Sequence, residues 1–293
     1  MRIAFIGLGN MGAPMSENLA RAGHSVCGHD IAARDIPGVM WLPSAVVAVQ
    51  DAEVIVTMLP NGGSLRGVYA EILGHVAAGA VLVDCSTVDV QDARTVARMA
   101  VDFGCEALDA PVSGGTSGAA AGTLTFMVGG SAGAFRRIEA FLLQMGSRAV
   151  HCGDSGAGQA AKICNNMLLG ISMIGVCEAF VLADKLGLDR ARLFDVASTS
   201  SGSCWSLNSY CPAPGIGPQT PADRNYAPGF AAELMLKDLT LSQTAARAVG
   251  AATPLGQQAT ALYAALLKAG GAGKDFSAML PYLSAFNREG CDV

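Results

Sequence analysis

The sequence lacks the patterns that identify disulfide-rich, metal-binding and nucleic-acid-binding proteins. None of its nine cysteines stands in a C-x-x-C pair, and its four histidines lie far apart without metal-ligand spacing. Charged residues make up only 15% of the 293 residues, the net charge is −5, and no basic cluster occurs. We therefore expect reduced, mostly buried thiols in a cytoplasmic protein, with no metal site and no nucleic-acid partner.

The sequence also lacks a convincing membrane segment. The apolar stretch at the N-terminus is too short for a signal peptide and is broken by glycines. Residues 163–183 are apolar enough to raise the question, but they contain Asn165, Asn166 and Glu178, which make a spanning helix costly. We expect a buried helix of a helical domain there, and no contact with a membrane.

Half of the residues are hydrophobic, which provides a sizeable core. In the first half of the chain, predicted strands alternate with helices, and this order predicts a Rossmann-type, doubly wound α/β fold with a mainly parallel sheet. The strands are predicted at residues 2–6, 25–30, 53–59, 80–85, 107–111, 124–129 and 149–152, and helices include residues 13–22, 89–103 and 134–145.

The pattern changes near residue 156, where strand signals end and long helical periodicities begin. We expect a dinucleotide-binding domain over residues 1–158. An all-helical domain for substrate binding and oligomerisation would follow over 159–293 and begin with a long connecting helix. The predicted helices are 159–186, 190–198, 230–249, 255–268 and 276–283. Residues 199–229 are predicted to be irregular, and an irregular run of this length is more often functional than accidental.

The opening MRIAFIGLGNMG places Gly7, Gly9 and Gly12 at the G-x-G-x-x-G spacing, between a buried strand and a helix. This order suits the pyrophosphate of a dinucleotide. Gly7 permits the tight turn, Gly9 lets the backbone approach the phosphates, and Gly12 lets the helix pack close to the strand. The alternative interpretation is an ordinary glycine-rich turn.

The end of the second predicted strand indicates which dinucleotide is bound. In VCGHDIAAR, Asp30 lies 18 residues after Gly12, where an acidic residue binds the adenosine ribose and repels a 2′-phosphate. This favours NAD over NADP. Arg34 lies close enough to leave NADP open, and a plain turn aspartate is the other alternative.

Three further strand ends carry small and polar residues on the edge where open sheets bind ligands: Met58–Asn61 (MLPN), Asp84–Thr87 (DCST) and Asp109–Gly115 (DAPVSGG). Backbone amides at Ser113, Gly114 and Gly115 would suit a carboxylate. A plain turn is the alternative.

Two later segments place polar residues in apolar helices. Lys162 and Asn166 are four residues apart and so lie on one helix face, and a buried lysine must be paired or neutral. Lys237 and Asp238 follow an apolar helical run. The alternatives are a snorkelling surface lysine for the first pair and an exposed ion pair for the second.

Taken together and in this order, GLGNMG, DCSTVD, DAPVSGG, GAGQAAKICNNMLLGISMIGVCEAF and the later GF and LMLKDL segments resemble the β-hydroxyacid dehydrogenase family over essentially the whole chain. The resemblance implies NAD-dependent oxidation of a small β-hydroxy acid, with Lys162 as the catalytic lysine and Asn166 as its helper. It also implies that Ser113, Gly114 and Gly115 bind the substrate carboxylate, that Lys237 faces the substrate and the nicotinamide, and that the members form dimers or tetramers. The implied cofactor contacts are Gly7, Leu8, Gly9, Asn10, Met11, Gly12, Asp30, Leu59, Pro60, Asn61, Thr87 and Lys237.

Other functions stay open at this point. A 2-hydroxy-3-oxopropionate reductase would share every motif. Imine reductases of similar architecture usually lack a lysine at the position of Lys162, and a non-catalytic dinucleotide-binding module is a remote alternative. The segment from Asp30 to Ser44, DIAARDIPGVMWLPS, is shorter than the family pattern, and Pro37 and Gly38 interrupt it. This predicts a remodelled wall on the adenine side of the cofactor.

Overall fold

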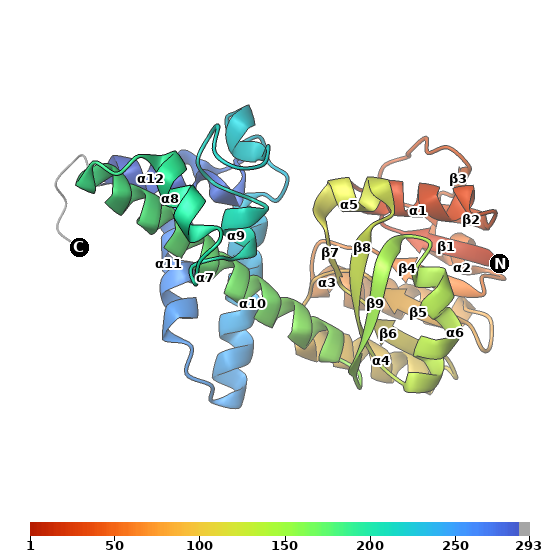
Figure 1. Ribbon diagram of the computed structural model, residues 1–293. Helices are drawn as coiled ribbons and strands as arrows, with labels where there is room; N and C mark the ends of the chain where they lie inside the picture. Colours follow the sequence, from red (N-terminus) through yellow and green to blue (C-terminus); the bar gives the residue numbers. More distant parts are fainter. Residues whose placement is uncertain (287–293) are drawn as a thin grey trace. The chain divides into compact units, whose positions relative to one another are not determined.

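The computed structural model describes residues 1–286, so Cys291 lies outside the described residues. The chain divides into two units, Met1–Lys162 and a second that begins at Ile163 (Figure 1). Helix α7 (Ala157–Leu186) runs unbroken from the first unit into the second. The eight cysteines within the described residues are free; Cys85, Cys105, Cys177 and Cys211 are buried.

The first unit is built on a nine-stranded sheet whose strands follow the order β3-β2-β1-β4-β5-β6-β8-β7, with β9 paired to β8. The first six strands of this order are parallel to one another, and they follow the strand order of a dinucleotide-binding sheet. Strand β8 runs antiparallel to β6 and β7. The strands are β1 (Arg2–Ile6), β2 (Ser25–His29), β3 (Val39–Trp41), β4 (Val54–Thr57), β5 (Val81–Asp84), β6 (Glu106–Asp109), β7 (Val112–Ser113), β8 (Leu124–Gly129) and β9 (Gly146–Gly153).

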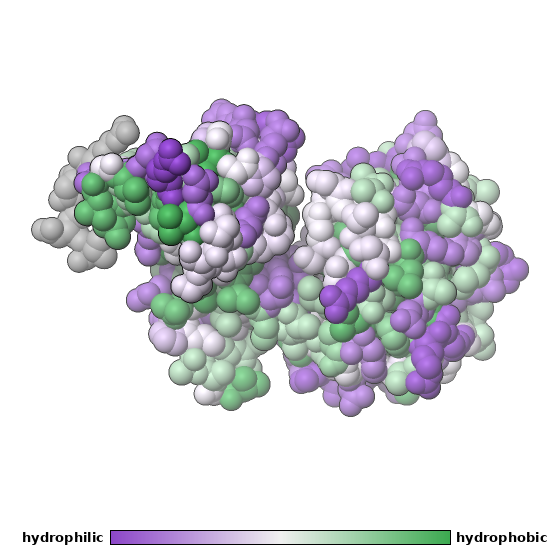
Figure 2. Space-filling view, in the orientation of Figure 1, coloured by the Kyte–Doolittle hydropathy of each residue, from purple (hydrophilic) through white to green (hydrophobic). Residues whose placement is uncertain are grey.

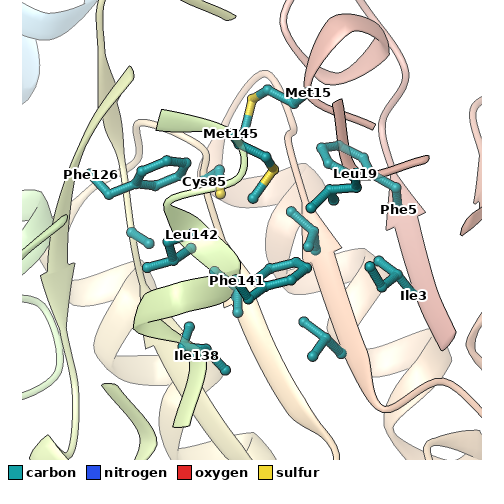
Figure 3. Close-up of a cluster of buried hydrophobic side chains, with 14 of the residues drawn as sticks. Ile3, Phe5, Met15, Leu19, Cys85, Phe126, Ile138, Phe141, Leu142 and Met145 are labelled. Atoms are coloured by element: carbon teal, nitrogen blue, oxygen red, sulfur yellow. The ribbon is translucent and has the colours of Figure 1, made fainter. Parts of the chain in front are cut away.

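Helices cover both faces of this sheet because its central strands are apolar on both sides. In β1, Ile3 and Phe5 face a cluster formed with α1, α5 and α6, whereas Ala4 and Ile6 face a cluster formed with α2, α3 and α4. Figure 3 shows the first cluster, in which Phe141 and Leu142 of α6 lie with Phe126 of β8. The helices of this unit are α1 (Gly12–Arg21), α2 (Ala45–Val49), α3 (Gly62–Ile72), α4 (Val90–Asp102), α5 (Gly115–Ala121) and α6 (Ala132–Leu142), with a short 3₁₀ helix η1 (Leu73–His75).

The predicted strands and the mainly parallel sheet are confirmed, but short elements were not predicted. Strand β3 has three residues and α2 has five, too few for a periodic pattern to appear. Helix α3 contains three glycines, which hide its helical signal, yet it buries Leu65, Tyr69 and Ile72. No helix lies between β2 and β3, where the sequence predicts an interrupted segment.

The second unit is helical over its described residues and has a core of its own. Its elements after α7 are α8 (Arg190–Ala197), α9 (Trp205–Asn208), the 3₁₀ helix η2 (Pro221–Arg224), α10 (Ala232–Val249), α11 (Pro254–Leu266) with a π-turn η3 (Leu267–Gly271), the 3₁₀ helix η4 (Phe276–Ala278) and α12 (Met279–Phe286).

Residues 199–229 are less irregular than the sequence indicates, because they contain α9 and η2. Thr220 and Asp223 form a capping box at the start of η2. Asp275 holds the end of the segment: its Oδ2 accepts hydrogen bonds from Tyr210 Oη, at 2.9 Å, and from the amides of Gly229 and Phe230, both at 3.0 Å. The segment is therefore an ordered part of this unit.

Helix α7 is the one helix within residues 1–286 that is long and apolar enough to cross a membrane, and half of its most apolar window is buried in the protein. The prediction of a buried helix is therefore correct for one face only, since Leu168 and Leu182 are more than half exposed. Apolar residues also appear on the surface of the second unit in Figure 2; the large exposed ones of this unit include Leu186, Leu188, Val196 and Leu255.

The glycine turn of the first unit is sterically demanding. Gly7 has a φ of +96°, and a Cβ at Gly12 would overlap the carbonyl oxygen of Gly7 and press against the ring of Phe5. The start of α1 thus packs directly on the end of β1. At Gly9, by contrast, an added Cβ would meet nothing within 4 Å.

Gly12→Ala is expected to lower the free energy of unfolding of the cofactor-free protein by about 1–3 kcal/mol, because the methyl group overpacks the contact between turn and helix. Gly67→Ala is the matched control. Gly67 is exposed within α3 and its Cβ would meet nothing within 4 Å. This change should stabilise the protein by roughly 0.5–1 kcal/mol. Urea unfolding measures both, and a Gly12→Ala protein as stable as the wild type would contradict the contact.

Candidate active site

The predicted site residues of the first unit follow the carboxyl ends of parallel strands, which meet at one edge of the sheet. The glycine turn follows β1, Asp30 follows β2, and Leu59, Pro60 and Asn61 follow β4. Thr87 lies after β5. The loop after β6 leads through β7 to Ser113, Gly114 and Gly115, and Lys162 approaches from α7. The fold thus brings together the residues predicted in this unit.

Asp30 is tied directly to the glycine turn. Its Oδ2 accepts a hydrogen bond from the amide of Leu8 at 2.7 Å, so the carboxylate lies beside the turn. Helix α1 has no side-chain cap and no acidic residue in its first turn, which leaves its N-terminal amides and positive dipole suited to an anion. Together with the open space at Gly9, this arrangement fits the pyrophosphate and ribose of NAD.

Asn61, in the loop after β4, caps the N-terminus of the next helix. Its Oδ1 accepts a hydrogen bond from the amide of Ser64 at 2.9 Å and caps α3. The amide of Leu59 donates to Ser86 Oγ at 2.8 Å, which joins this loop to the loop after β5. The two loops predicted to contact the cofactor therefore support each other.

Asp84, the last residue of β5, is a buried carboxyl group beneath these loops. Its Oδ1 accepts hydrogen bonds from Thr57 Oγ1 at 2.8 Å and Ser86 Oγ at 2.6 Å, whereas its Oδ2 has no hydrogen-bond partner within residues 1–286. Burial raises the pKa of Asp84 to about 7, and these hydrogen bonds only partly oppose the shift. The group therefore changes its charge near neutral pH.

Asp109 ends the neighbouring strand β6 and stands opposite Asp84 in the strand register. Its Oδ1 accepts the amide of Gly156 at 2.7 Å and its Oδ2 accepts the amide of Gln159 at 2.9 Å, so the carboxylate caps the start of α7. A Cβ at Gly158 would overlap the carbonyl oxygens of Met127 and Asp109, so only glycine allows the helix to begin this close to the sheet. Burial raises the pKa of Asp109, and the backbone hydrogen bonds oppose the rise.

Lys162 lies on the second turn of α7 and is 7% exposed. Its Nζ donates a hydrogen bond to the carbonyl oxygen of Val112 at 2.7 Å. Val112 immediately precedes Ser113, the first residue of the predicted carboxylate loop. A buried amine therefore sits beside that loop, and the alternative of a snorkelling surface lysine is wrong.

Asn166 and Lys237 belong to the second unit. Asn166 is buried, and its Nδ2 donates to Asp238 Oδ2 at 2.5 Å. Asp238 is also buried, and its Oδ1 lies 3.9 Å from the half-buried Nζ of Lys237. The alternative of an exposed ion pair is therefore wrong for these residues.

Three polar residues that position these groups were not among the predicted site residues: Asp109, Gln159 and Asp238. Asp109 was noted only as the start of the DAPVSGG segment and Asp238 only as the neighbour of Lys237. Asp238 shares the buried face of α10 with Met235 and Leu239, and a carboxylate inside that apolar period is the signal that could have found it. The contacts of Asp109 and Gln159 gave no local signal, because their partners lie about 50 and 70 residues away. Within residues 1–286, no group of three or more His, Cys, Asp or Glu side chains could hold a metal.

Comparison with known proteins agrees with this geometry. Residues 2–153 match the family model described as the NAD-binding domain of 6-phosphogluconate dehydrogenase. Residues 156–283 match the model described as NAD-binding of NADP-dependent 3-hydroxyisobutyrate dehydrogenase.

Full-length relatives are similar as well. A 3-hydroxyisobutyrate dehydrogenase of Pseudomonas aeruginosa is 48% identical over 287 residues, covering 94% of this chain and 96% of the relative. An NAD-dependent L-serine dehydrogenase of the same organism is 45% identical over 284 residues, covering 94% and 95%. A solved structure of Mycobacterium tuberculosis 3-hydroxyisobutyrate dehydrogenase with L-serine has a TM-score of 0.91 at 48% identity and covers 96% of this chain and 98% of its own.

The fold, the site and these matches define an NAD-dependent oxidoreductase with a Rossmann-type first unit and a helical second unit. The chain belongs to the β-hydroxyacid dehydrogenase family, in the group of the 3-hydroxyisobutyrate dehydrogenases.

The buried carboxyl of Asp84 predicts a pH dependence of stability. Between about pH 4 and 7 the folded protein keeps a proton on Asp84 that the unfolded chain has released, so this group makes stability fall as pH rises through that range and then level off. Asp84→Asn should remove this contribution. The wild type should lose stability relative to the variant by on the order of 2–4 kcal/mol between pH 4 and pH 8.

Urea unfolding at a series of pH values measures this difference. Asp154→Asn, which removes an exposed carboxylate just before α7, controls for the loss of one negative charge and should leave the pH dependence unchanged. Parallel stability curves for the wild type and Asp84→Asn would contradict the assignment.

Proposed function

We propose that the protein oxidises 3-hydroxyisobutyrate to methylmalonate semialdehyde with NAD as the acceptor, a step of valine degradation, and that Lys162 is the general base. The observation that carries the proposal is the buried amine of Lys162, held 2.7 Å from the carbonyl oxygen of Val112 beside the Ser113–Gly115 loop. Relatives that are 45–48% identical carry the names of enzymes acting on small β-hydroxy acids.

The reaction removes a hydride from the β-carbon and a proton from its hydroxyl group. NAD supplies the hydride acceptor when it is bound. Lys162 takes the hydroxyl proton as the general base, and its amine is buried beside the loop that holds the substrate carboxylate. Backbone amides at Ser113, Gly114 and Gly115 bind the carboxylate, so the substrate is held at one end while the other end reacts.

We assign supporting roles to two residues of the second unit. Asn166, whose side chain is oriented by Asp238, would hydrogen-bond Lys162 and the substrate oxygen. Lys237 would face the substrate and the nicotinamide end of the cofactor. Both assignments come from the family resemblance, and the burial of Asn166 and Asp238 supports the idea that this polar group is maintained for function.

A second substrate deserves the same test because of the comparisons. L-Serine also carries a hydroxyl group on the β-carbon of a carboxylic acid. One relative is named for its oxidation, and the solved structure described above contains it. A 2-hydroxy-3-oxopropionate reductase remains the third candidate. The Cys204–Trp205–Ser206 segment and the proline-rich run after it resemble the 3-hydroxyisobutyrate group, and this favours the first substrate.

We also propose that the enzyme is a cytoplasmic homodimer or homotetramer. Exposed leucines on the second unit, including Leu168, Leu182 and Leu186, support assembly through this unit, because large apolar side chains at a surface commonly mark protein contacts.

The function is tested by initial rates of reduced-nicotinamide formation, measured by absorbance. The substrates are 3-hydroxyisobutyrate, L-serine, glycerate and 3-hydroxypropionate, each with NAD and with NADP. We expect the highest kcat/KM with 3-hydroxyisobutyrate and NAD, because an acidic residue at the end of the second strand, such as Asp30, binds the ribose in folds of this kind and disfavours a 2′-phosphate. A preference for L-serine would make L-serine the substrate, and a preference for NADP would contradict the role of Asp30.

Lys162→Ala should lower kcat/KM by roughly 10²–10⁴-fold, the usual contribution of a general base, while NAD binding is retained. Titration of the protein with NADH, followed by fluorescence, measures that binding. Lys185→Ala, which changes an exposed lysine later in α7, is the matched control and should keep full activity. Activity of Lys162→Ala within tenfold of the wild type would remove this lysine from the mechanism.

A further inference from the structure

The side chain of Gln159 links α7 to the loop after β5. Gln159 is fully buried. Its Nε2 donates to the carbonyl oxygen of Ser86 at 2.8 Å, and its Oε1 accepts the amide of Val88 at 3.1 Å. One amide group therefore binds the backbone immediately before and immediately after Thr87, which fixes the path of the chain at that residue.

The backbone of Gln159 is held as firmly as its side chain. Its amide donates to Asp109 Oδ2 at 2.9 Å in the cap of α7. Lys162 follows three residues later on the same helix, and residues three apart lie on neighbouring positions of one face. A single residue thus connects the loop that carries Thr87 with the turn of helix that carries Lys162.

The partner of Gln159 in the loop is itself anchored. Ser86 Oγ donates to Asp84 Oδ1 at 2.6 Å and accepts the amide of Leu59 at 2.8 Å. The loop after β4 is thereby joined to the same network. All the hydrogen bonds of this network lie within the first unit and are buried or half-buried.

We propose that Gln159 is a positioning residue for hydride transfer. Through its hydrogen bonds to Ser86 and Val88 it fixes the position of the Thr87 loop, which is predicted to contact the cofactor, relative to the amine of Lys162. The inference rests on the proposed function of Lys162. It adds a residue that touches neither substrate nor cofactor and acts through the groups that do.

The chemistry of the link requires an amide. The carbonyl of Ser86 needs a donor and the amide of Val88 needs an acceptor, and glutamine supplies both from one rigid group. Gln159→Met keeps the length of the side chain and loses both hydrogen bonds. Gln159→Glu keeps the shape, but its ionised carboxylate can only accept, whereas the protonated carboxyl group can also donate to Ser86.

Gln159→Met should lower kcat by roughly 30–100-fold, because a small misplacement of reacting groups costs this much, while the KM for NAD changes less than about threefold. Gln243→Met is the matched control. Gln243 is a buried glutamine of the second unit that accepts from Thr253 Oγ1 at 3.0 Å. It should lower the melting temperature without changing kcat. Equal kcat for Gln159→Met and the wild type would overturn the proposal.

Gln159→Glu adds a readout that a purely structural role would not give. The ratio of its kcat to the wild-type kcat should rise as pH falls, because protonation restores the donor to Ser86. The titratable groups of the surrounding elements include Tyr69, Asp84, Cys85, Asp109 and Lys162. Gln159→Met controls for their titration, and the ratio of its kcat to the wild-type kcat should not rise as pH falls. A Gln159→Glu ratio that is independent of pH would overturn the proposal.

Hydrogen exchange of the Val88 amide tests the link without any activity. The wild type should protect this amide and Gln159→Met should lose the protection, at least tenfold in exchange rate. An unprotected Val88 in the wild type would overturn the inference and leave the dehydrogenase function standing. If the wild type oxidised none of the tested substrates, the proposed dehydrogenase function would be overturned. The hydrogen-exchange rate of the Val88 amide would still show whether Gln159 holds the loop.

Discussion

The capping of α7 by the carboxylate of Asp109 is the interaction on which the site depends. Asp109 is the last residue of β6, and its two oxygens bind the amides of Gly156 and Gln159 at the start of the helix. This contact sets the helix against the sheet edge and so determines where Lys162 lies. Because Gly158 has no side chain, nothing separates the helix from the strand ends, and the amine of Lys162 reaches the carbonyl of Val112.

The edge of the sheet is organised by buried polar groups rather than by apolar packing. Asp84 and Asp109 stand opposite each other on neighbouring strands, and burial raises the pKa of both. Two buried carboxyl groups are unfavourable for stability, so their presence makes sense where directional hydrogen bonds must hold several loops at once. The apolar clusters on the two faces of the sheet offset the cost of burying these carboxyl groups.

Much of the fold could be predicted from the sequence. Strands such as β1 and β8 are apolar runs bounded by turn residues, and the glycine spacing of residues 7–12, placed between a strand and a helix, predicts the dinucleotide turn. Short elements such as β3 and α2 could not be predicted, because three to five residues carry no period. In the site, Lys162 drew notice as a lysine in an apolar helix, and the family resemblance supplied its catalytic role. The contacts of Gln159 and Asp109 could not be predicted, since a polar side chain reveals its burial only when distant strands come together.

The short connection between β2 and β3 has a consequence for how the cofactor site tolerates substitution. Residues 31–35 form no helix and are exposed, and the side chain of Ile31 contacts almost nothing. Substitutions there change the surface beside the ribose position at little expense to folding. Asp30, in contrast, holds the amide of Leu8 and cannot be exchanged without disturbing the phosphate turn. The loop can therefore change beside the ribose position while the turn that Asp30 holds stays intact, so substitutions at residues 31–35 can adjust cofactor binding without loss of the fold.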